Sequence, residues 1–390
     1  MSTKSKPLLT VLGGISAEHF LSEFWQKKPL IIRQAFPGYT CPVTSDELAG
    51  LAMEDEVESR LILEKDGSAP WELRTGPFDE QTFSTLPKSH WTLLIQQLDA
   101  WAPEINQLKS AFDFIPNWRI DDIMASYAPI GGSVGPHFDQ YDVFLLQAGG
   151  HRSWKTGQRC DDQSPCLAET DLRILENFET EQEWLLAPGD MLYLPPGLAH
   201  YGVATDDCIT LSIGFRAPSH QQLLSDFTDH LLESISPNTL YQDPNLATQA
   251  HAGEITSQSI HQVSSIIEAY LNNKTQFNEW FGRFITEPKN TLSLGEDAPD
   301  FTAEELHELV SQQATLYRNE GARFAYIENP DHIALFVDGH DFQLIPNHLS
   351  EIQLLCGHTT LIASELLKKP IDKPLFKVIH ELIQQGSLYF

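Results

Sequence analysis

Three side chains in this sequence have the types and the spacing of a transition-metal site. His137 and Asp139 stand two residues apart at the head of the run HFDQYDVFLLQA, and His200 follows the segment PGDMLYLPPG. Alternate residues of a strand point to the same face, so His137 and Asp139 could bind one ion together. Two imidazoles and one carboxylate form the facial triad of non-haem Fe(II) oxygenases, which leaves positions for a cosubstrate and O₂. The pattern predicts an iron site on His137, Asp139 and His200.

An isolated HxD pair is a weak signal, because most such pairs lie at surfaces or cap turns. The alternative is that His200 is a core histidine with satisfied hydrogen bonds and that His137 belongs to a turn. We favour the metal site because all three residues fall at expected strand starts beside turns rich in glycine or proline.

Arg152 lies fifteen residues beyond His137, after a Gly-Gly turn. Oxygenases of this type often use 2-oxoglutarate, whose distal carboxylate needs a buried cation, and the planar guanidinium of arginine suits it. His151 and Lys155 are rivals for this role, and a solvated turn residue is the alternative for each. A hydroxyl usually supplements the cation, and three candidates lie just upstream: Ser126, Tyr127 and Ser133.

Short strands are the elements that must position these residues. After an expected helix capped by Ser16 and a strand over 30–36, strand-like runs separated by turn-forming residues cover 120–130, 137–148, 183–196, 199–204 and 208–217. Within 183–196, we expect a turn at 188–190. Many short strands without intervening helices predict a barrel or a sandwich.

Helical periodicity replaces this pattern at residue 219. We expect helices over 219–235 and 256–272, and apolar residues line one face of the second: Ile260, Val263, Ile266, Ile267 and Tyr270. Two helices bury little by themselves. The apolar face therefore packs on another domain or on a second copy of the chain, unless the pair packs only within its own chain.

The remainder, from residue 276, combines helices with a hairpin. We expect helices over 303–316, 360–369 and 374–386, and a hairpin that turns at residues 329–331. This combination predicts a winged-helix-like module. Such modules often bind DNA, but 8 Lys and Arg against 17 Asp and Glu from residue 276 onward argue against DNA here.

The whole chain of 390 residues carries a net charge of −29, which would repel nucleic acid and attract cationic partners, although solubility alone would also explain it. Five scattered cysteines predict a reducing cytoplasm without a disulfide framework. Cys160 and Cys166 could bind a metal, but two free thiols in a loop are the better interpretation. We find no membrane span and no secretory leader pattern near the N-terminus.

Two stretches, GGSVGPHFDQYDVFLLQAGGHRSWKTG and PGDMLYLPPGLAHYGVA, resemble the JmjC-type 2-oxoglutarate/Fe(II) oxygenases, and among them the bacterial ribosomal oxygenases; FWQKKPLIIRQAF supports the resemblance. It implies a mainly β catalytic domain, a double-stranded β-helix of the cupin/JmjC type, over 1–217. A helical dimerisation region over 218–275 and an α+β winged-helix-like domain over 276–390 would follow. It also implies iron on His137, Asp139 and His200, 2-oxoglutarate on Arg152 with Ser126, and a homodimer.

Bacterial members of that family hydroxylate an arginine of the large-subunit ribosomal protein L-sixteen, so the resemblance implies the same reaction, with Fe(II), 2-oxoglutarate and O₂. An acidic enzyme suits a basic ribosomal protein as its substrate. Tyr141 and Asp142 could contact a cationic substrate, or could be strand residues with structural hydrogen bonds. Two alternatives stay open: another JmjC oxygenase, such as a histidine hydroxylase or a demethylase, or a non-catalytic ribosome-assembly or interaction factor.

Overall fold

The computed structural model describes residues 8–64, 71–168, 170–289, 301–367 and 373–390. Its contacts divide the chain into two compact units, Met1–Ala217 and Pro218–Phe390. Residues 1–7, part of the stretch that we searched for a leader, and residues 368–369, the end of one expected helix, lie outside the described residues.

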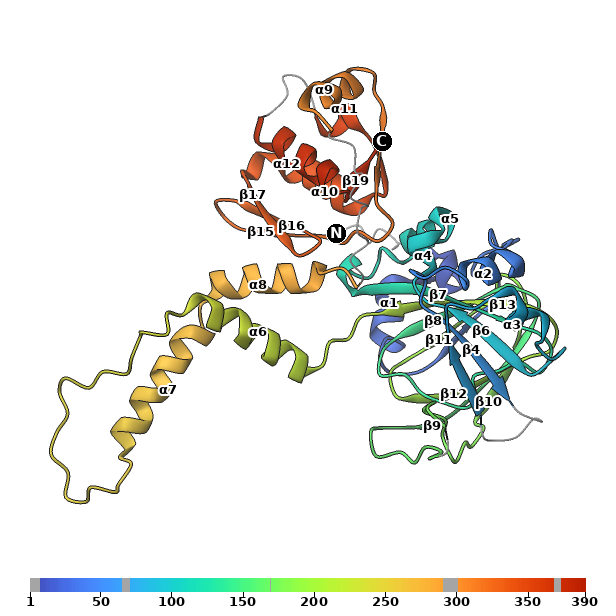
Figure 1. The fold of residues 1–390 in the computed structure, drawn as a ribbon, viewed down its shortest axis with the longest axis horizontal. Helices are drawn as coiled ribbons and strands as arrows, with labels where there is room; N and C mark the ends of the chain where they lie inside the picture. The colour runs from blue at the N-terminus through green and yellow to red at the C-terminus, as the bar shows by residue number, and fades with distance from the viewer. Residues whose placement is uncertain (1–7, 65–70, 169, 290–300, 368–372) are drawn as a thin grey trace, which may run out of the picture. The chain divides into compact units, whose positions relative to one another are not determined.

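Besides a short two-stranded sheet near the N-terminus, the first unit contains two antiparallel sheets (Figure 1). The larger has the strand order β3-β11-β8-β13-β7-β6-β4-β5, and the smaller has the order β10-β9-β12. The larger sheet consists of β3 (Leu30–Ile32), β4 (Ser59–Glu64), β5 (Trp71–Thr75), β6 (Trp91–Ile95), β7 (Ile120–Ala128), β8 (Val143–Gly149), β11 (Met191–Leu194) and β13 (Cys208–Phe215). The smaller consists of β9 (Arg152–Arg159), β10 (Gln182–Leu186) and β12 (Leu198–Ala204).

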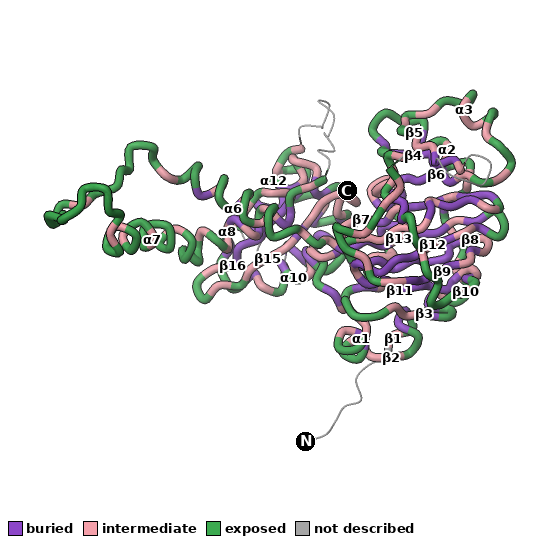
Figure 2. The backbone as a smooth tube through the Cα atoms, turned by 90° about the horizontal axis from the view of Figure 1, so that it is seen from below, coloured by how far each residue is buried: buried purple, intermediate pink, exposed green. Residues whose placement is uncertain are grey.

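The larger sheet has a hydrophobic core on each face. One face packs against N-terminal helices, through buried residues such as Phe20, Leu48 and Ile105. The short elements on this side and at the edges are β1 (Leu8–Leu9), β2 (Ile15–Ser16), α1 (Ala17–Glu23), α2 (Ser45–Leu51), α3 (Glu80–Ser84), α4 (Leu98–Trp101) and α5 (Pro103–Asn106). The other face packs on the smaller sheet, where Leu145 of β8 and Trp154 of β9 belong to one buried cluster. Purple strands in the first unit mark this double core in Figure 2.

Two expectations about strands in this unit were wrong. The run 137–148 is not one strand, because β8 begins only at Val143 and a bend occupies residues 140 and 141. The turn-forming stretch expected over 149–159 is mostly strand, because β9 already begins at Arg152. Buried residues alternate with partly exposed ones over the start of β9, which is the period of a half-buried strand. Glycines and charged residues nearby concealed this period.

The second unit begins with three helices, α6 (His220–Ser234), α7 (Ser257–Leu271) and α8 (Lys274–Thr286). Ser219 caps α6 in a capping box: its hydroxyl oxygen accepts from the main-chain N–H of Gln222, and its own main-chain N–H donates to the Gln222 side chain. Phe227 and Leu231 of α6 pack on Trp280 of α8. The α6–α7 connection and α7 are drawn mostly green, as exposed chain, in Figure 2. No helix was predicted from the sequence where α8 lies, and the predicted domain boundary at residue 276 falls within this helix.

The rest of the second unit has two three-stranded sheets, β15-β16-β17 and β18-β14-β19, with helices around them. The expected hairpin is present as β15 and β16. The expected helix over 303–316 ends at Ser311, because Thr315–Arg318 pairs as strand β14. The helix expected over 360–369 is instead the strand Thr360–Ile362 followed by the short helix Ala363–Leu366. The elements are α9 (Ala303–Ser311), β14 (Thr315–Arg318), β15 (Phe324–Glu328), β16 (Ile333–Val337), β17 (His340–Leu344), α10 (Leu349–Gly357), β18 (Thr360–Ile362), α11 (Ala363–Leu366), α12 (Lys373–Gln384) and β19 (Leu388–Tyr389).

Among the described residues, no helix is long and apolar enough to cross a membrane.

Candidate metal centre

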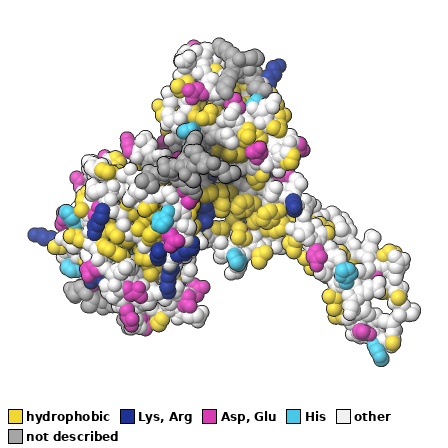
Figure 3. All heavy atoms as spheres, turned by 180° about the vertical axis from the view of Figure 1, so that it is seen from behind, with side chains coloured by type: hydrophobic (Ala, Val, Ile, Leu, Met, Phe, Trp, Pro, Cys, Tyr) yellow, Lys and Arg dark blue, Asp and Glu magenta, His cyan; other side chains and the backbone are white. Residues whose placement is uncertain are grey.

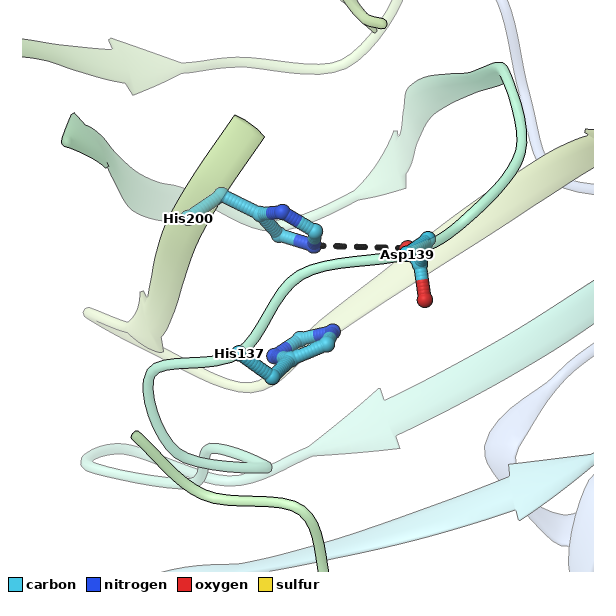
Figure 4. Close-up of side chains that lie close together, drawn as sticks. All are labelled: His137, Asp139 and His200. Carbon is cyan, nitrogen blue, oxygen red and sulfur yellow. Dashed lines mark ion pairs between the residues drawn. The ribbon is translucent and has the colours of Figure 1, made fainter. Parts of the chain in front are cut away.

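The three predicted ligands lie together in the first unit (Figure 4). The possible ligand atoms of His137, Asp139 and His200 all lie within 4.8 Å of one another, and this is the one such cluster of three among the described residues. Nε2 of His200 lies 3.6 Å from Oδ2 of Asp139. His200 comes from β12, and main-chain hydrogen bonds of 3.0 and 2.8 Å join it in both directions to His137. This bridge, rather than a continuous strand, holds His137 beside β12.

Backbone carbonyls orient both imidazole rings. Nδ1 of His137 lies 2.9 Å from the carbonyl oxygen of Gly135, and Nδ1 of His200 lies 3.0 Å from that of Leu198. A carbonyl oxygen only accepts, so each Nδ1 carries the proton and each Nε2 keeps its lone pair. Histidine ligands of metals are fixed in the same way. Two oriented Nε2 atoms and a carboxylate therefore fit a divalent metal ion such as Fe(II).

The surroundings of His200 keep it uncharged. Burial, and then the neighbouring His137, lower the pKa of His200 from 6.5 to about 4. The side chain is 3% exposed, whereas that of Asp139 is 24% exposed. A protonated imidazole cannot bind a metal, so the low pKa leaves His200 ready for metal binding in mildly acidic solution.

The metal-free protein is expected to lose stability as the pH falls from about 6.5 towards 4. In that window the unfolded chain binds a proton at His200 that the folded chain does not bind, so acid favours unfolding, by on the order of 3 kcal/mol when both pKa values have been passed. Urea unfolding with a chelator, at several pH values, measures this. His200→Asn should flatten the profile in that window, and His251→Asn, in an exposed loop, should not. Identical profiles for wild type and His200→Asn would contradict the assignment.

Arg152, the first residue of β9, is a buried cation. It is only 2% exposed, and its Nε and Nη2 atoms have no hydrogen-bond partner. It stands in register with Leu186 on one side and with Ala204 on the other, so no carboxylate faces it across either strand. A buried, unpaired guanidinium is costly, which points to an anionic ligand that completes it. The chain supplies no acceptor for Nε and Nη2 of Arg152, and a carboxylate group of a dicarboxylate ligand could accept hydrogen bonds from both.

The rival cations have other environments. His151 is exposed and pairs with Asp206, with its Nδ1 2.7 Å from Oδ2. Lys155 lies on the other face of β9, 4.0 Å from Glu183.

Of the candidate hydroxyls, Ser126 is buried on β7, in register with Thr210. It shares a face with Ala128, which packs on Ala204 of the smaller sheet. Its contact with a cosubstrate stays a prediction.

The other two hydroxyls are engaged elsewhere. The Ser133 hydroxyl accepts a hydrogen bond from the main-chain N–H of Gly135, and Tyr127 packs on Trp91 at the outer face of the sheet.

Asp142 has a structural role. Its side chain is fully buried and accepts hydrogen bonds from Tyr193 (2.6 Å) and Gln26 (2.9 Å), with Arg119 at 3.7 Å. These contacts anchor the bend that follows Asp139.

Tyr141, by contrast, is 42% exposed. The charge of Asp139, then burial, then Asp122 and Asp121 raise the pKa of its hydroxyl. Tyr141 therefore lies in a negative field beside the metal ligands.

Cys160 and Cys166 are free thiols, as expected. They do not take part in the cluster of possible metal ligands found among the described residues. One functional candidate, Trp154, was not identified from the sequence. Its indole lies between Arg152 and His200, and the only sequence signal was its position two residues after the arginine, on the same face of a strand.

Comparisons with known proteins agree with this geometry. Residues 107–223 match the JmjC domain, residues 269–389 match the ROXA-like winged helix, and residues 178–269 match the AraC-like ligand binding domain. The chain is 32% identical to the ribosomal protein uL16 3-hydroxylase of Escherichia coli (strain K12), over 95% of this chain and 96% of that protein. It is 33% identical to the "Probable ribosomal oxygenase" of Haemophilus influenzae, over 92% and 86%.

Solved structures give the same result. The X-ray structure of E. coli ycfD superposes with a TM-score of 0.86 at 32% identity, covering 96% of this chain and 97% of that one. The complex of YcfD with cobalt and 2-oxoglutarate gives a TM-score of 0.84 at 31% identity, with coverage of 96% and 97%. These matches confirm the predicted fold class: a JmjC/cupin β-domain, a helical region and a winged-helix C-terminal domain.

Proposed function

Because this chain belongs to the JmjC-domain ribosomal oxygenases, we propose that it hydroxylates an arginine side chain of uL16, the L-sixteen protein of the large ribosomal subunit. It is a 2-oxoglutarate-dependent oxygenase, and its cofactors are Fe(II) and 2-oxoglutarate. The observation that carries the proposal is the convergence of His137, Asp139 and His200 in the unit that also buries Arg152, whose Nε and Nη2 have no hydrogen-bond partner.

The roles of the residues follow from their surroundings. His137, Asp139 and His200 would hold the metal, with both imidazoles fixed by their Nδ1 hydrogen bonds. Arg152 would bind the distal carboxylate of 2-oxoglutarate through two parallel hydrogen bonds. Bound Fe(II), together with 2-oxoglutarate and O₂, supplies the oxidant that puts oxygen into an unactivated C–H bond. The apolar cluster around Leu145 and Trp154 keeps water from the inner side of the site.

An arginine as the substrate fits the negative field around Tyr141. The carboxylates of Asp139, Asp122 and Asp121 all act on its hydroxyl. Gly214 lies beside them: a Cβ at this glycine would stand 3.4 Å from Oδ1 of Asp122 and 3.9 Å from the Tyr141 ring. A guanidinium stacked on Tyr141 would face these carboxylates, which favours a cationic side chain over a neutral one.

Mass spectrometry tests the proposal. Purified uL16 is incubated with the enzyme, Fe(II), 2-oxoglutarate and air, and the expected product is an arginine that has gained one oxygen atom. The His200→Ala protein is the control and should give no product. Loss of a methyl group, or oxidation of a histidine instead, would favour another JmjC reaction. If no ribosomal protein is oxidised and no succinate forms, the non-catalytic alternative stands.

The helical region is proposed to join two copies of the chain. Exposed apolar side chains line α6 and α7, among them Leu224 (64%), Ile260 (59%) and Ile267 (53%). Figure 3 shows hydrophobic side chains at the surface of this region. A second copy would cover faces of this kind. The cytoplasmic location and the lack of a DNA partner stay predictions.

A paired substitution, Ile260→Asp with Ile267→Asp, is expected to turn a dimer into a monomer, because two buried carboxylates would face the partner's apolar surface. Sedimentation velocity measures the change. Ile345→Asp is the control, since Ile345 is also 51% exposed but lies in the C-terminal part. A wild-type monomer, or a double variant that still dimerises, would refute this interface.

A further inference from the structure

Two buried donors without partners lie on the inner face of β9. Arg152 is 2% exposed and Trp154 is 4% exposed. In addition to the two guanidinium nitrogens of Arg152, the indole Nε1 of Trp154 is buried without a hydrogen-bond partner. Residues two apart on a strand share a face, so both side chains point towards the larger sheet. A buried N–H without an acceptor costs roughly 1–3 kcal/mol, and such groups are few in native proteins.

The indole of Trp154 lies between the two ends of the cosubstrate site. The guanidinium carbon of Arg152 is 5.7 Å from the centre of the ring, and the imidazole of His200 is 5.9 Å from it, centre to centre. The strand register gives the same order, because Arg152 is opposite Ala204, Trp154 is opposite Gly202, and Thr156 is opposite His200. A dicarboxylate that reaches from the metal ligands to Arg152 must therefore pass along Trp154.

Gly202 determines which edge of the indole faces β12. A Cβ at this position would come within 2.7–2.8 Å of Cη2, Cζ3 and Cε3 of Trp154. The benzene edge of the ring is thus seated on the glycine. The edge that carries Nε1 lies on the opposite side of the ring, away from β12. Only glycine allows this close approach, so the chain keeps the ring in one orientation.

A water molecule is a poor partner for this N–H. A buried water needs two to four polar partners, whereas the buried cluster to which Trp154 belongs otherwise consists of apolar side chains, and Arg152 beside its ring can only donate. The other buried members of this cluster are Val143, Leu145, Leu186, Leu192, Leu194 and Leu198. A ligand that brings its own acceptor, and that also neutralises Arg152, satisfies both donors at once.

We propose that Trp154 is a cosubstrate-binding residue whose indole N–H donates a hydrogen bond to a carboxylate oxygen of the bound dicarboxylate, while its ring face positions the guanidinium of Arg152. The inference rests on the proposed function, which supplies 2-oxoglutarate as the ligand. It adds a donor that the sequence did not identify, and it explains why the indole N–H lies beside two guanidinium nitrogens that also lack hydrogen-bond partners.

Calorimetric titration of 2-oxoglutarate into the Mn(II)-loaded chain, without oxygen, tests the inference directly. In Trp154→Phe the N–H is lost, and a hydrogen bond to a charged group of the usual strength predicts a roughly ten- to hundredfold weaker Kd for 2-oxoglutarate. The affinity for Mn(II) alone should stay unchanged, because the indole is not a ligand. Trp184→Phe is the matched control: Trp184 is the register partner of Trp154 on β10 and is only partly buried, so the Kd should not change.

A second variant separates the hydrogen bond from the shape of the ring. In it the indole of residue 154 is replaced by the isosteric benzothiophene, which keeps both rings and lacks the N–H. A weaker Kd in both variants supports the inference. A wild-type Kd in the benzothiophene variant overturns it, whatever Trp154→Phe does. If the wild-type chain itself does not bind 2-oxoglutarate, the proposed function fails, and that outcome is distinct from both.

Discussion

Replacing His200 by alanine is expected to abolish metal binding and hydroxylation together. His200 offers the most buried of the three possible ligand groups, and its Nε2 is already aimed at the carboxylate of Asp139. Removing a residue that only hydrogen-bonds to a metal ligand lowers metal affinity about 10–100-fold, so removing a ligand itself should lower the affinity more than about a hundredfold. An anaerobic Fe(II) titration measures the affinity, and mass spectrometry of the ribosomal substrate measures the activity.

His151→Ala is the matched control for this experiment. His151 also pairs with an aspartate, Asp206, but both side chains are exposed, at 44% and 50%, and lie outside the cluster. Its metal affinity and its activity should match those of wild type. Circular dichroism should show that both variants are folded. A His200→Ala protein that is folded and still binds one Fe(II) as tightly as wild type would disprove the proposed ligand set.

Replacing Arg152 by methionine is expected to weaken 2-oxoglutarate binding and to stabilise the ligand-free protein. The bound carboxylate would lose its buried charged partner, which costs about 2–5 kcal/mol, or roughly thirty- to several-thousandfold in Kd. Without ligand, however, the guanidinium is buried and lacks hydrogen bonds at Nε and Nη2. An apolar side chain of similar length removes that penalty, so we expect the free energy of unfolding to rise by about 1–3 kcal/mol.

The opposite signs of these two effects make the prediction specific. Calorimetry with 2-oxoglutarate gives the first, and urea unfolding of the ligand-free chain gives the second. Lys155→Met is the control, because Lys155 lies on the outer face of the same strand and is 34% exposed. It should change neither quantity by much. An Arg152→Met chain that binds 2-oxoglutarate normally, or that is strongly destabilised without ligand, would show that Arg152 has a structural role instead.

Much of the fold was predictable because the signals are local. The predicted N-cap at Ser16 depends on residues within one helical turn, and it is present. The capping box at Ser219, found only in the structure, is equally local. The turn between β10 and β11, and the hairpin of β15 and β16, follow from glycine, proline and asparagine at fixed offsets. By contrast, β14 and β18 look helical in sequence but pair with each other, because their partners come from a distant part of the chain.

The sequence by itself determined the composition of the candidate site. Two histidines and an aspartate at expected strand starts, with an arginine after a glycine turn, indicate the chemistry through residue type and short spacing. Only the tertiary structure decided how these groups meet. The bridge between His137 and His200, the anchoring of the bend by Asp142, and the seating of Trp154 on Gly202 all depend on chain segments tens of residues apart.

The physical reason is the difference between local and long-range contacts. Periodicity and turn chemistry act between neighbours, so the sequence shows them directly. Whether a cation is buried, and whether a donor lacks a partner, depends on every strand that surrounds it. The fold buries Arg152 and Trp154 with donors that lack partners, and it gives Asp142 two hydrogen-bond donors. The sequence alone could not distinguish these three environments.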